Sequence, residues 1–271
     1  MESNGIPKVL ATDLDGTLIP LDGNGQNVAD LERLSRHLNE HQIQLVFVTG
    51  RHLASVLGAI DDYRLPCPQW MICDVGTSIY ERDEAGEYQL SSGYTDCLAK
   101  IAKDCSPTFL IDALRSVSGL RLQEAEKQGL FKLSFYTKGA DLRPIAEQVR
   151  ALLLSLALPY SVVASTDPFT GDGLIDLLPC EVSKAFAIDW WTKQQGLLAT
   201  DVLYAGDSGN DSAVFAAGYA SIVVANASTD VLDHAQQCHA QRGWSERLYA
   251  APFPATSGVL AGLQHFTSRA F

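Results

Sequence analysis

Two aspartates follow the first apolar run of the chain, at a spacing that suits nucleophilic and acid–base chemistry. Asp13 and Asp15 come after the run 9–12, and Gly16 then breaks the pattern. An apolar run that ends in a turn signal is typical of a buried parallel strand, and open α/β sheets place their sites at the carboxyl ends of such strands. Residues two apart in a strand point to the same side. The simpler alternative is a solvated Asp-Gly turn.

Three further groups of polar residues stand beside predicted elements later in the chain. Lys184 begins a predicted helix over 183–195, and a solvated lysine is its simpler interpretation. The other two groups directly follow the apolar runs 43–48 and 202–205, which predict strands. Their members are Thr49, Gly50 and Arg51 after the first run, and Gly206, Asp207, Ser208, Gly209, Asn210 and Asp211 after the second.

These residue types suit the transfer of a phosphoryl group. The oxygens of a phosphate monoester are anionic, so its hydrolysis depends on positioning and on neutralisation of charge. A carboxylate nucleophile divides the reaction into two steps, and a second acid nearby can move the proton. Lys184 is the cation expected beside the phosphoryl group, while Thr49 and the Gly50 amide can bind anionic oxygens. The carboxylate oxygens also suit Mg²⁺.

The composition of the chain argues against several classes of partner. A formal net charge of −12 predicts a surface that repels nucleic acid and anionic lipid. The most apolar stretch, 151–158, is too short for a membrane span, which takes about 20 residues. Cysteines without a C-x-x-C pair and a start without a secretory signal lead us to expect a cytoplasmic protein. We expect a monomer or a small homo-oligomer.

The order of predicted elements indicates an α/β fold. Predicted strands over 7–13, 43–48 and 70–73 alternate with helical patterns, which favours a parallel sheet with right-handed crossovers. After the charged segment 81–87 the pattern changes to two helical stretches and an alternating strand over 131–136.

We therefore predict two units. The first is a Rossmann-like core, a parallel sheet flanked by helices, formed by residues 1–83 and 167–271. The second is a smaller inserted α/β cap at 84–166. Residues 174–178 are predicted to be a strand of the core.

The four groups of polar residues, in this order, resemble the signature of the haloacid dehalogenase superfamily of phosphatases. The resemblance implies that Asp13 is the nucleophile, which forms an aspartyl-phosphate, and that Asp15 is the acid and base. It implies an Mg²⁺ site at Asp13, Asp15, Asp207 and Asp211, with Asp15 contributing its backbone carbonyl and Asp211 holding a metal-bound water or Lys184. Phosphate and substrate binding fall to Thr49, Gly50, Arg51, Lys184 and Asn210.

Further segments resemble one family of that superfamily, the sucrose-phosphate phosphatases. They are 75–80, 131–136, 175–179, 204–211, 223–227 and 257–266. The resemblance implies Mg²⁺-dependent hydrolysis of sucrose 6-phosphate. It also implies a cap that determines substrate specificity and is inserted between Arg51 and Lys184. Within the cap, Gln128 and Lys132 are candidates for sugar contact, although Lys132 can equally lie on the exposed face of its strand. Asn226 and Asp176 match family positions near the site.

The identity of the sugar stays open at this point. Mannosylfructose phosphate, glucosylglycerol phosphate and monosaccharide phosphates are alternatives to sucrose 6-phosphate. A sugar-phosphate mutase shares the motifs, and a phospho-accepting signalling module would need only Asp13 and Lys184. A non-catalytic carbohydrate-binding protein is a further alternative, against which the intact acid pair argues.

Overall fold

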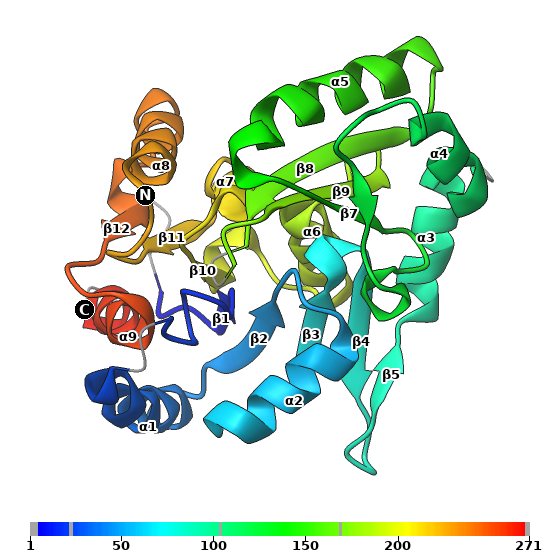
Figure 1. Cartoon of the computed structure of the whole chain (residues 1–271). Helices are drawn as coiled ribbons and strands as arrows, with labels where there is room; N and C mark the ends of the chain where they lie inside the picture. Colours follow the sequence, from blue (N-terminus) through cyan, green and yellow to red (C-terminus); the bar gives the residue numbers. More distant parts are fainter. Residues whose placement is uncertain (1–4, 22–23, 103–104, 168–169, 269–271) are drawn as a thin grey trace.

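A computed structural model describes residues 5–21, 24–102, 105–167 and 170–268 of the chain. Its strands form one eight-stranded and one four-stranded sheet (Figure 1). The strands of the larger sheet are β1 (Val9–Thr12), β2 (Gln44–Val48), β3 (Trp70–Cys73), β4 (Ser78–Arg82), β5 (Tyr88–Leu90), β10 (Val202–Gly206), β11 (Ala220–Val223) and β12 (Leu248–Ala250). Their order is β12-β11-β10-β1-β2-β3-β4-β5, parallel from β12 to β3 and antiparallel from β3 to β5.

Helices cover both faces of this sheet, which explains why its inner strands are apolar on both sides. One face packs against α1 (Gly25–Glu40), α2 (Leu53–Tyr63) and α9 (Ala255–Ser268). The other packs against α3 (Ser92–Ala102), α6 (Lys184–Gln194), α7 (Ser212–Phe215) and α8 (Thr229–Gln241). Strand β1 alternates between them, because Leu10 joins the first cluster while Val9 and Ala11 join the second. The predicted fold class is thus confirmed.

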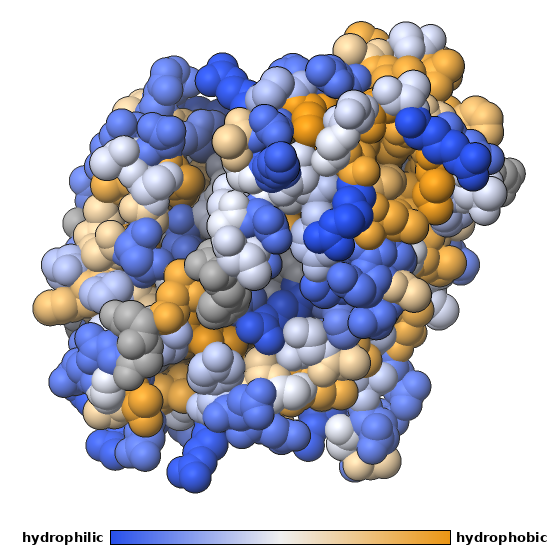
Figure 2. All heavy atoms as spheres, viewed as in Figure 1, coloured by the Kyte–Doolittle hydropathy of each residue, from blue (hydrophilic) through white to orange (hydrophobic). Residues whose placement is uncertain are grey.

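The smaller sheet and its helices form a second unit with an apolar cluster of its own, which we call the cap. The sheet has the order β6-β7-β9-β8, with β6 (Arg121–Leu122), β7 (Leu133–Thr137), β9 (Gly173–Pro179) and β8 (Tyr160–Thr166). The helices α4 (Pro107–Leu114) and α5 (Leu142–Ser155) share an apolar cluster with it. Figure 2 shows hydrophobic surface gathered over this unit, whose exposed apolar side chains include Phe109, Leu154 and Leu156.

The prediction that 174–178 is a strand of the core is wrong. Strand β9 pairs antiparallel with β7 and β8 along its length. As an inner strand of its sheet it is as deeply buried as a core strand, so its apolar pattern is the same. Since β5 also belongs to the larger sheet, we propose that the cap runs from α3 to β9 instead of over 84–166.

No helix among the described residues is both long and apolar enough to span a bilayer.

Candidate active site

The predicted site residues meet at the carboxyl edge of the larger sheet, where the strand order reverses. β1 lies at the centre, with β2 and β3 on one side and β10 to β12 on the other. Asp13 follows β1, Thr49 follows β2 and Asp207 follows β10. The N–H of Asp13 still donates to the Ala205 carbonyl at 2.9 Å, so the ladder holds this residue in register. Ligand sites of open α/β sheets lie at such reversal points.

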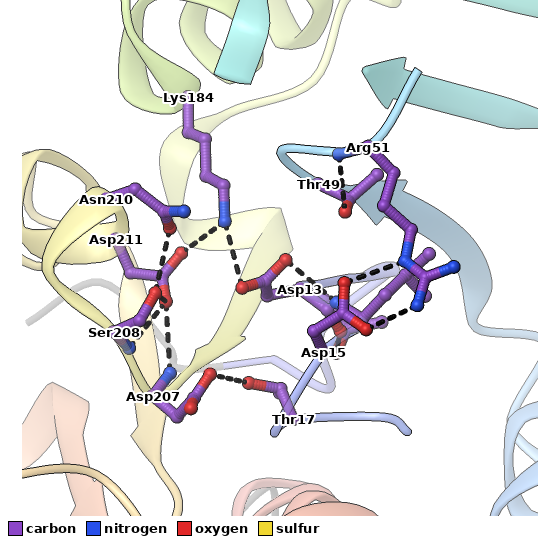
Figure 3. Close-up of polar contacts among 12 residues, drawn as sticks. Asp13, Asp15, Thr17, Thr49, Arg51, Lys184, Asp207, Ser208, Asn210 and Asp211 are labelled. Atoms are coloured by element: carbon purple, nitrogen blue, oxygen red, sulfur yellow. Dashed lines mark hydrogen bonds and ion pairs between the residues drawn. The ribbon is translucent and has the colours of Figure 1, made fainter. Parts of the chain in front are cut away.

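The alternation of β1 directs Asp13 toward the helix that carries Lys184. Val9 and Ala11 face the α6 side of the sheet, and Asp13 continues this series. Lys184 is the first residue of α6, and its side chain is fully buried. Its Nζ lies 3.0 Å from Asp13 Oδ2 and 2.6 Å from Asp211 Oδ1 (Figure 3).

Asp211 anchors the loop after β10. Its Oδ1 accepts hydrogen bonds from Lys184 Nζ at 2.6 Å and from the Tyr204 hydroxyl at 2.5 Å. Its Oδ2 accepts from the backbone N–H groups of Asp207 at 3.0 Å and Ser208 at 2.9 Å. Both oxygens therefore already have partners, and Asp211 positions Lys184 and the loop that carries Asp207. The sequence did not predict that Tyr204 would bind Asp211, because an aromatic residue in an apolar run is typical of the core.

The electrostatics of the site are those of buried carboxylates around one ammonium group. Burial raises the pKa of Asp13 well above its usual value, although Lys184 opposes the shift. Burial and the charge of Asp211 raise the pKa of Asp207 to about 7. Burial works to lower the pKa of Lys184, but Asp13 and Asp211 outweigh it and raise the pKa. The site therefore has more acidic groups than its lysine neutralises.

The acidic groups fit a hard divalent cation. Carboxylate oxygens of Asp13, Asp207 and Asp211 all lie within 4.8 Å of one another. Each oxygen of Asp211 accepts two or more hydrogen bonds. Each oxygen of Asp13 and Asp207 faces a single donor, which leaves these two side chains with room for a metal. Oxygen ligands of this kind suit Mg²⁺. The carboxylate of Asp15 is outside this cluster, which leaves its backbone carbonyl as the group that could contribute.

Asp15 faces the other side of the site, toward Arg51. The Arg51 guanidinium donates two hydrogen bonds to the Asp15 carboxylate, from Nε to Oδ2 at 2.7 Å and from Nη2 to Oδ1 at 2.6 Å (Figure 3). This hydrogen bonding raises the pKa of Arg51. The Thr49 hydroxyl oxygen accepts from the Arg51 N–H at 3.2 Å. Arg51, predicted to bind substrate, thus holds Asp15 in this structure.

Two neighbours of Asp207 orient its carboxylate. The Thr17 hydroxyl donates to Oδ1 at 2.7 Å. The Asn226 amide donates to Oδ2 at 3.3 Å and to the Gly16 carbonyl at 2.8 Å. Asn226 therefore does lie at the site, as its match to the family suggested. No sequence signal pointed to the bond between Thr17 and Asp207.

The site opens into a cavity of about 540 Å³ between the core and the cap. Lys184 and Asp211 are fully buried below it. The predicted residues that line it are Asp13, Asp15, Thr49, Gly50, Arg51, Lys132, Asp207 and Asn210. The cap contributes further lining residues, among them Gln123, Lys127, Tyr136, Leu174 and Asp176.

The alternation of β7 explains which cap residues face the cavity. Leu133 and Phe135 join the apolar cluster of the cap, whereas Lys132 and Tyr136 line the cavity. Asp176 is opposite Ser134 in the register of β9 and β7, and its Oδ1 accepts a hydrogen bond from the Ser134 hydroxyl at 2.5 Å. Burial raises the pKa of Asp176. The alternation of 131–136 in the sequence already places Lys132 and Tyr136 on the same face of the strand. It could therefore have predicted Tyr136 as a cavity residue.

The structure does not bring Gln128 to this cavity. Its Nε2 donates to the carbonyls of Gln123 at 3.0 Å and Ser134 at 3.1 Å, and its Oε1 accepts from the Ser134 N–H at 2.8 Å. These bonds tie the segment before β7 to the sheet. Gln128 therefore has a structural role. Lys132 lines the cavity and is buried, so the alternative of an exposed strand face is wrong.

Comparison with known proteins agrees with this geometry. Residues 6–267 match the family model described as sucrose-6F-phosphate phosphohydrolase. A protein of Nitrosococcus oceani described as a HAD-like hydrolase is 32% identical over 95% of this chain and 71% of its own length. The mannosylfructose-phosphate phosphatase of Agrobacterium fabrum is 27% identical over 96% of each chain.

A solved structure shares the fold over nearly the whole length. It is the sucrose-phosphatase of Synechocystis sp. in complex with sucrose and phosphate, with a TM-score of 0.78 and 24% identity over 95% of this chain and 97% of that one. The chain is a phosphoric monoester hydrolase of the haloacid dehalogenase superfamily, and it belongs to the sucrose-6F-phosphate phosphohydrolase family.

Proposed function

We propose that the protein hydrolyses a sugar phosphate with the help of Mg²⁺, with sucrose 6-phosphate as the preferred substrate. The observation that carries the proposal is the position of Asp13, which lines the cavity and whose carboxylate lies 3.0 Å from a fully buried lysine. The family match over residues 6–267 and the sucrose and phosphate bound to the Synechocystis protein support the choice of sugar. The Agrobacterium relative makes mannosylfructose phosphate the second candidate.

Asp13 is the proposed nucleophile. Its Oδ1 accepts the Leu14 N–H at 2.8 Å and its Oδ2 faces Lys184, so both oxygens are fixed in direction. One of them attacks phosphorus, the bond to the sugar oxygen breaks, and an aspartyl-phosphate forms. Lys184 compensates negative charge beside the phosphoryl group throughout.

Asp15 is the proposed acid and base. To act as the acid, Asp15 must separate from Arg51 and carry a proton, because both of its oxygens accept from the guanidinium in the substrate-free protein. It then gives that proton to the departing sugar oxygen and regains one from the water that cleaves the aspartyl-phosphate. Arg51 fixes the direction of its carboxylate in the substrate-free protein. Thr49 and Gly50 line the cavity beside this pair and are proposed to bind the phosphate oxygens.

Mg²⁺ would be held by Asp13, Asp207 and the Asp15 carbonyl, and it would supply neutralisation of the phosphate charge. Asp211 supports this site from below through Lys184 and the backbone of Asp207. Asn210, which lines the cavity next to Asp207, is proposed to contact the phosphate.

The cap supplies the proposed sugar pocket. Its side of the cavity offers an amide from Gln123, a hydroxyl from Tyr136 and a carboxyl group from Asp176. Such groups donate to and accept from sugar hydroxyls. A cavity of about 540 Å³ is in the usual range for small-molecule sites.

A panel of sugar phosphates tests the proposal. The wild-type protein with Mg²⁺ is assayed for free phosphate from sucrose 6-phosphate, mannosylfructose phosphate, glucosylglycerol phosphate and hexose phosphates, with Asp13→Asn as the inactive control. We expect the highest kcat/KM with sucrose 6-phosphate. Preference for another member of the panel would reject sucrose, and formation of an isomeric sugar phosphate without free phosphate would show a mutase.

A further inference from the structure

Lys132 is a cap residue whose charged group is bound by the core. Its side chain is 5% exposed, and its Nζ lies 2.9 Å from Asp74 Oδ1. The same Nζ is 3.5 Å from the Gly50 carbonyl. Asp74 follows β3 and Gly50 follows β2, so one ammonium group from the cap reaches two loops at the carboxyl edge of the core sheet. A buried lysine needs such partners, because an unpaired charge is costly away from water.

The turn that carries Asp74 has an unusual backbone. Asp74 has φ 54°, Val75 has φ 58° and Gly76 has φ 94°. A left-handed conformation is rare for side chains branched at Cβ, so the surrounding structure must hold Val75 in place. The N–H of Asp74 donates to the Arg51 carbonyl at 2.9 Å, and that of Val75 donates to the Thr49 carbonyl at 3.1 Å. The strained turn is thus bonded to the loop proposed to bind phosphate.

The same turn packs against the start of α6. A Cβ atom added to Gly76 would lie 2.4 Å from the Ser183 carbonyl oxygen and 2.8 Å from the Lys184 nitrogen. The Gly76 carbonyl in turn accepts the Tyr94 hydroxyl at 2.6 Å. A shift of the turn toward α6 would therefore press on the backbone of Lys184, whose side chain faces Asp13.

We propose that Lys132 and Asp74 are positioning residues that latch the cap onto the core and thereby fix the loop 49–51 and the turn 74–76 beneath it. When the cap is closed, Lys132 neutralises Asp74 and holds the Gly50 carbonyl, and the turn supports Lys184 from the side. The catalytic consequence rests on the function proposed above. The coupling between cap and core loops does not, and it is measurable without substrate.

Direct contact between Lys132 and the sugar is the competing role, since Lys132 also lines the cavity. The two roles differ in their dependence on Asp74. A latch loses its effect when either partner is changed, whereas a sugar contact survives the loss of Asp74.

A double-mutant cycle separates these roles. Lys132→Met, Asp74→Asn and the double variant are compared with the wild type for kcat and KM with the best sugar phosphate. A latch predicts that each single variant lowers kcat/KM by roughly tenfold and that the double variant is no worse than either one. The proposal would be overturned if the losses of kcat/KM in the two single variants multiplied in the double variant. It would also be overturned if Lys132→Met changed KM alone.

Hydrogen exchange tests the latch without substrate. In both single variants we expect faster exchange at the amides of 49–51 and of the cap segment 129–132. Lys127→Met is the matched control, because Lys127 lines the same cavity but pairs with Glu124 and Tyr136, both within the cap. It should leave exchange at 49–51 unchanged. Unchanged exchange at 49–51 in Lys132→Met and Asp74→Asn would refute the latch even if the enzyme acts on sugar phosphates.

Loss of a buried partner can destabilise the fold, so the melting temperature of every variant is measured first. Lys132→Gln, which keeps a hydrogen-bond donor without the charge, replaces Lys132→Met if the latter unfolds. If exchange responds as expected while no sugar phosphate is hydrolysed, the latch stands and the proposed function fails.

Discussion

Replacement of Lys184 by Met should show how strongly one buried cation holds the site together. Lys184 Nζ lies 3.0 Å from Asp13 and 2.6 Å from Asp211, and these side chains are at most 6% exposed. At an effective dielectric constant of about 20, each attraction amounts to about 6 kcal/mol before the cost of desolvation. Removing one member of a buried ion pair typically costs about 3–5 kcal/mol. We therefore expect Lys184→Met to lower the free energy of unfolding by about 3–5 kcal/mol. Met is similar to Lys in length, so the substitution removes the charge and largely keeps the packing.

A matched control is available on the same helix. Lys193 pairs with Asp189 at the same 2.6 Å, but the two side chains are 69% and 55% exposed. Exposed pairs contribute less than about 1 kcal/mol. Urea unfolding of Lys184→Met, Lys193→Met and the wild type, in metal-free buffer, compares the same substitution in a buried cluster with two carboxylates and in an exposed pair. Equal losses in the two variants would refute the electrostatic account of the site.

The loss in Lys184→Met should depend on pH in a defined direction. Burial already raises the pKa of Asp13, and the variant removes the cation that opposes this shift. A carboxyl group whose pKa is higher in the folded state takes up a proton on folding, so its folded form is favoured at low pH and loses stability as pH rises. In the folded wild-type protein the pKa of Asp207 is raised to about 7, and Lys184 opposes this rise. Below that pH Asp207 takes up a proton on folding in both proteins, so the deficit should grow as the pH rises through about 7. A deficit that shrinks over this range would contradict the assignment.

Three shorter predictions concern the reaction and its metal. Asp13→Asn should bind the sugar phosphate in calorimetry yet release no phosphate; measurable turnover would exclude Asp13 as the nucleophile. Chelation with EDTA should abolish phosphate release, because the clustered carboxylates repel an anionic substrate. Added Mg²⁺ should restore the activity. Full activity in verified metal-free buffer would remove Mg²⁺ from the mechanism. Gly16→Ala should lower both stability and Mg²⁺ affinity, since Gly16 has φ +76° and the new Cβ would lie 2.3 Å from Asp207 Oδ2. The strain alone is worth about 1–3 kcal/mol, and a thermal melt with and without Mg²⁺ measures both effects; unchanged values would show that the loop relaxes.

The core and its site could be predicted because local pattern and topology agree there. The apolar runs before Asp13, Thr49 and Asp207 are all parallel strands of one sheet, so their ends had to meet at one edge. The position of Lys184 was less determined by local sequence, because a lysine at a helix start is ordinary. Its role follows from the packing of α6 on the side of the sheet that Asp13 faces.

The cap was harder to predict because its central pairing joins β7 to β9 across α5 and β8. β9 is one of the two inner cap strands, and its burial gives it the composition of a core strand. The role of Gln128 was missed for a related reason. Its three hydrogen bonds go to backbone groups of Gln123 and Ser134, and composition does not reveal which partner an amide will find.

The pairing of the cavity's cations bears on how an acidic protein can accept an anionic substrate. Each Lys or Arg side chain that lines the cavity in the described ranges already has a carboxylate partner. The pairs are Arg51 with Asp15, Lys127 with Glu124 and Lys132 with Asp74, while Lys184 below the cavity has Asp13 and Asp211. The cations thus cancel local negative charge and leave little positive potential for a phosphate group. A divalent ion at Asp13 and Asp207 would reverse this balance, so we expect the phosphate affinity of the protein to follow Mg²⁺ occupancy more closely than any single lysine.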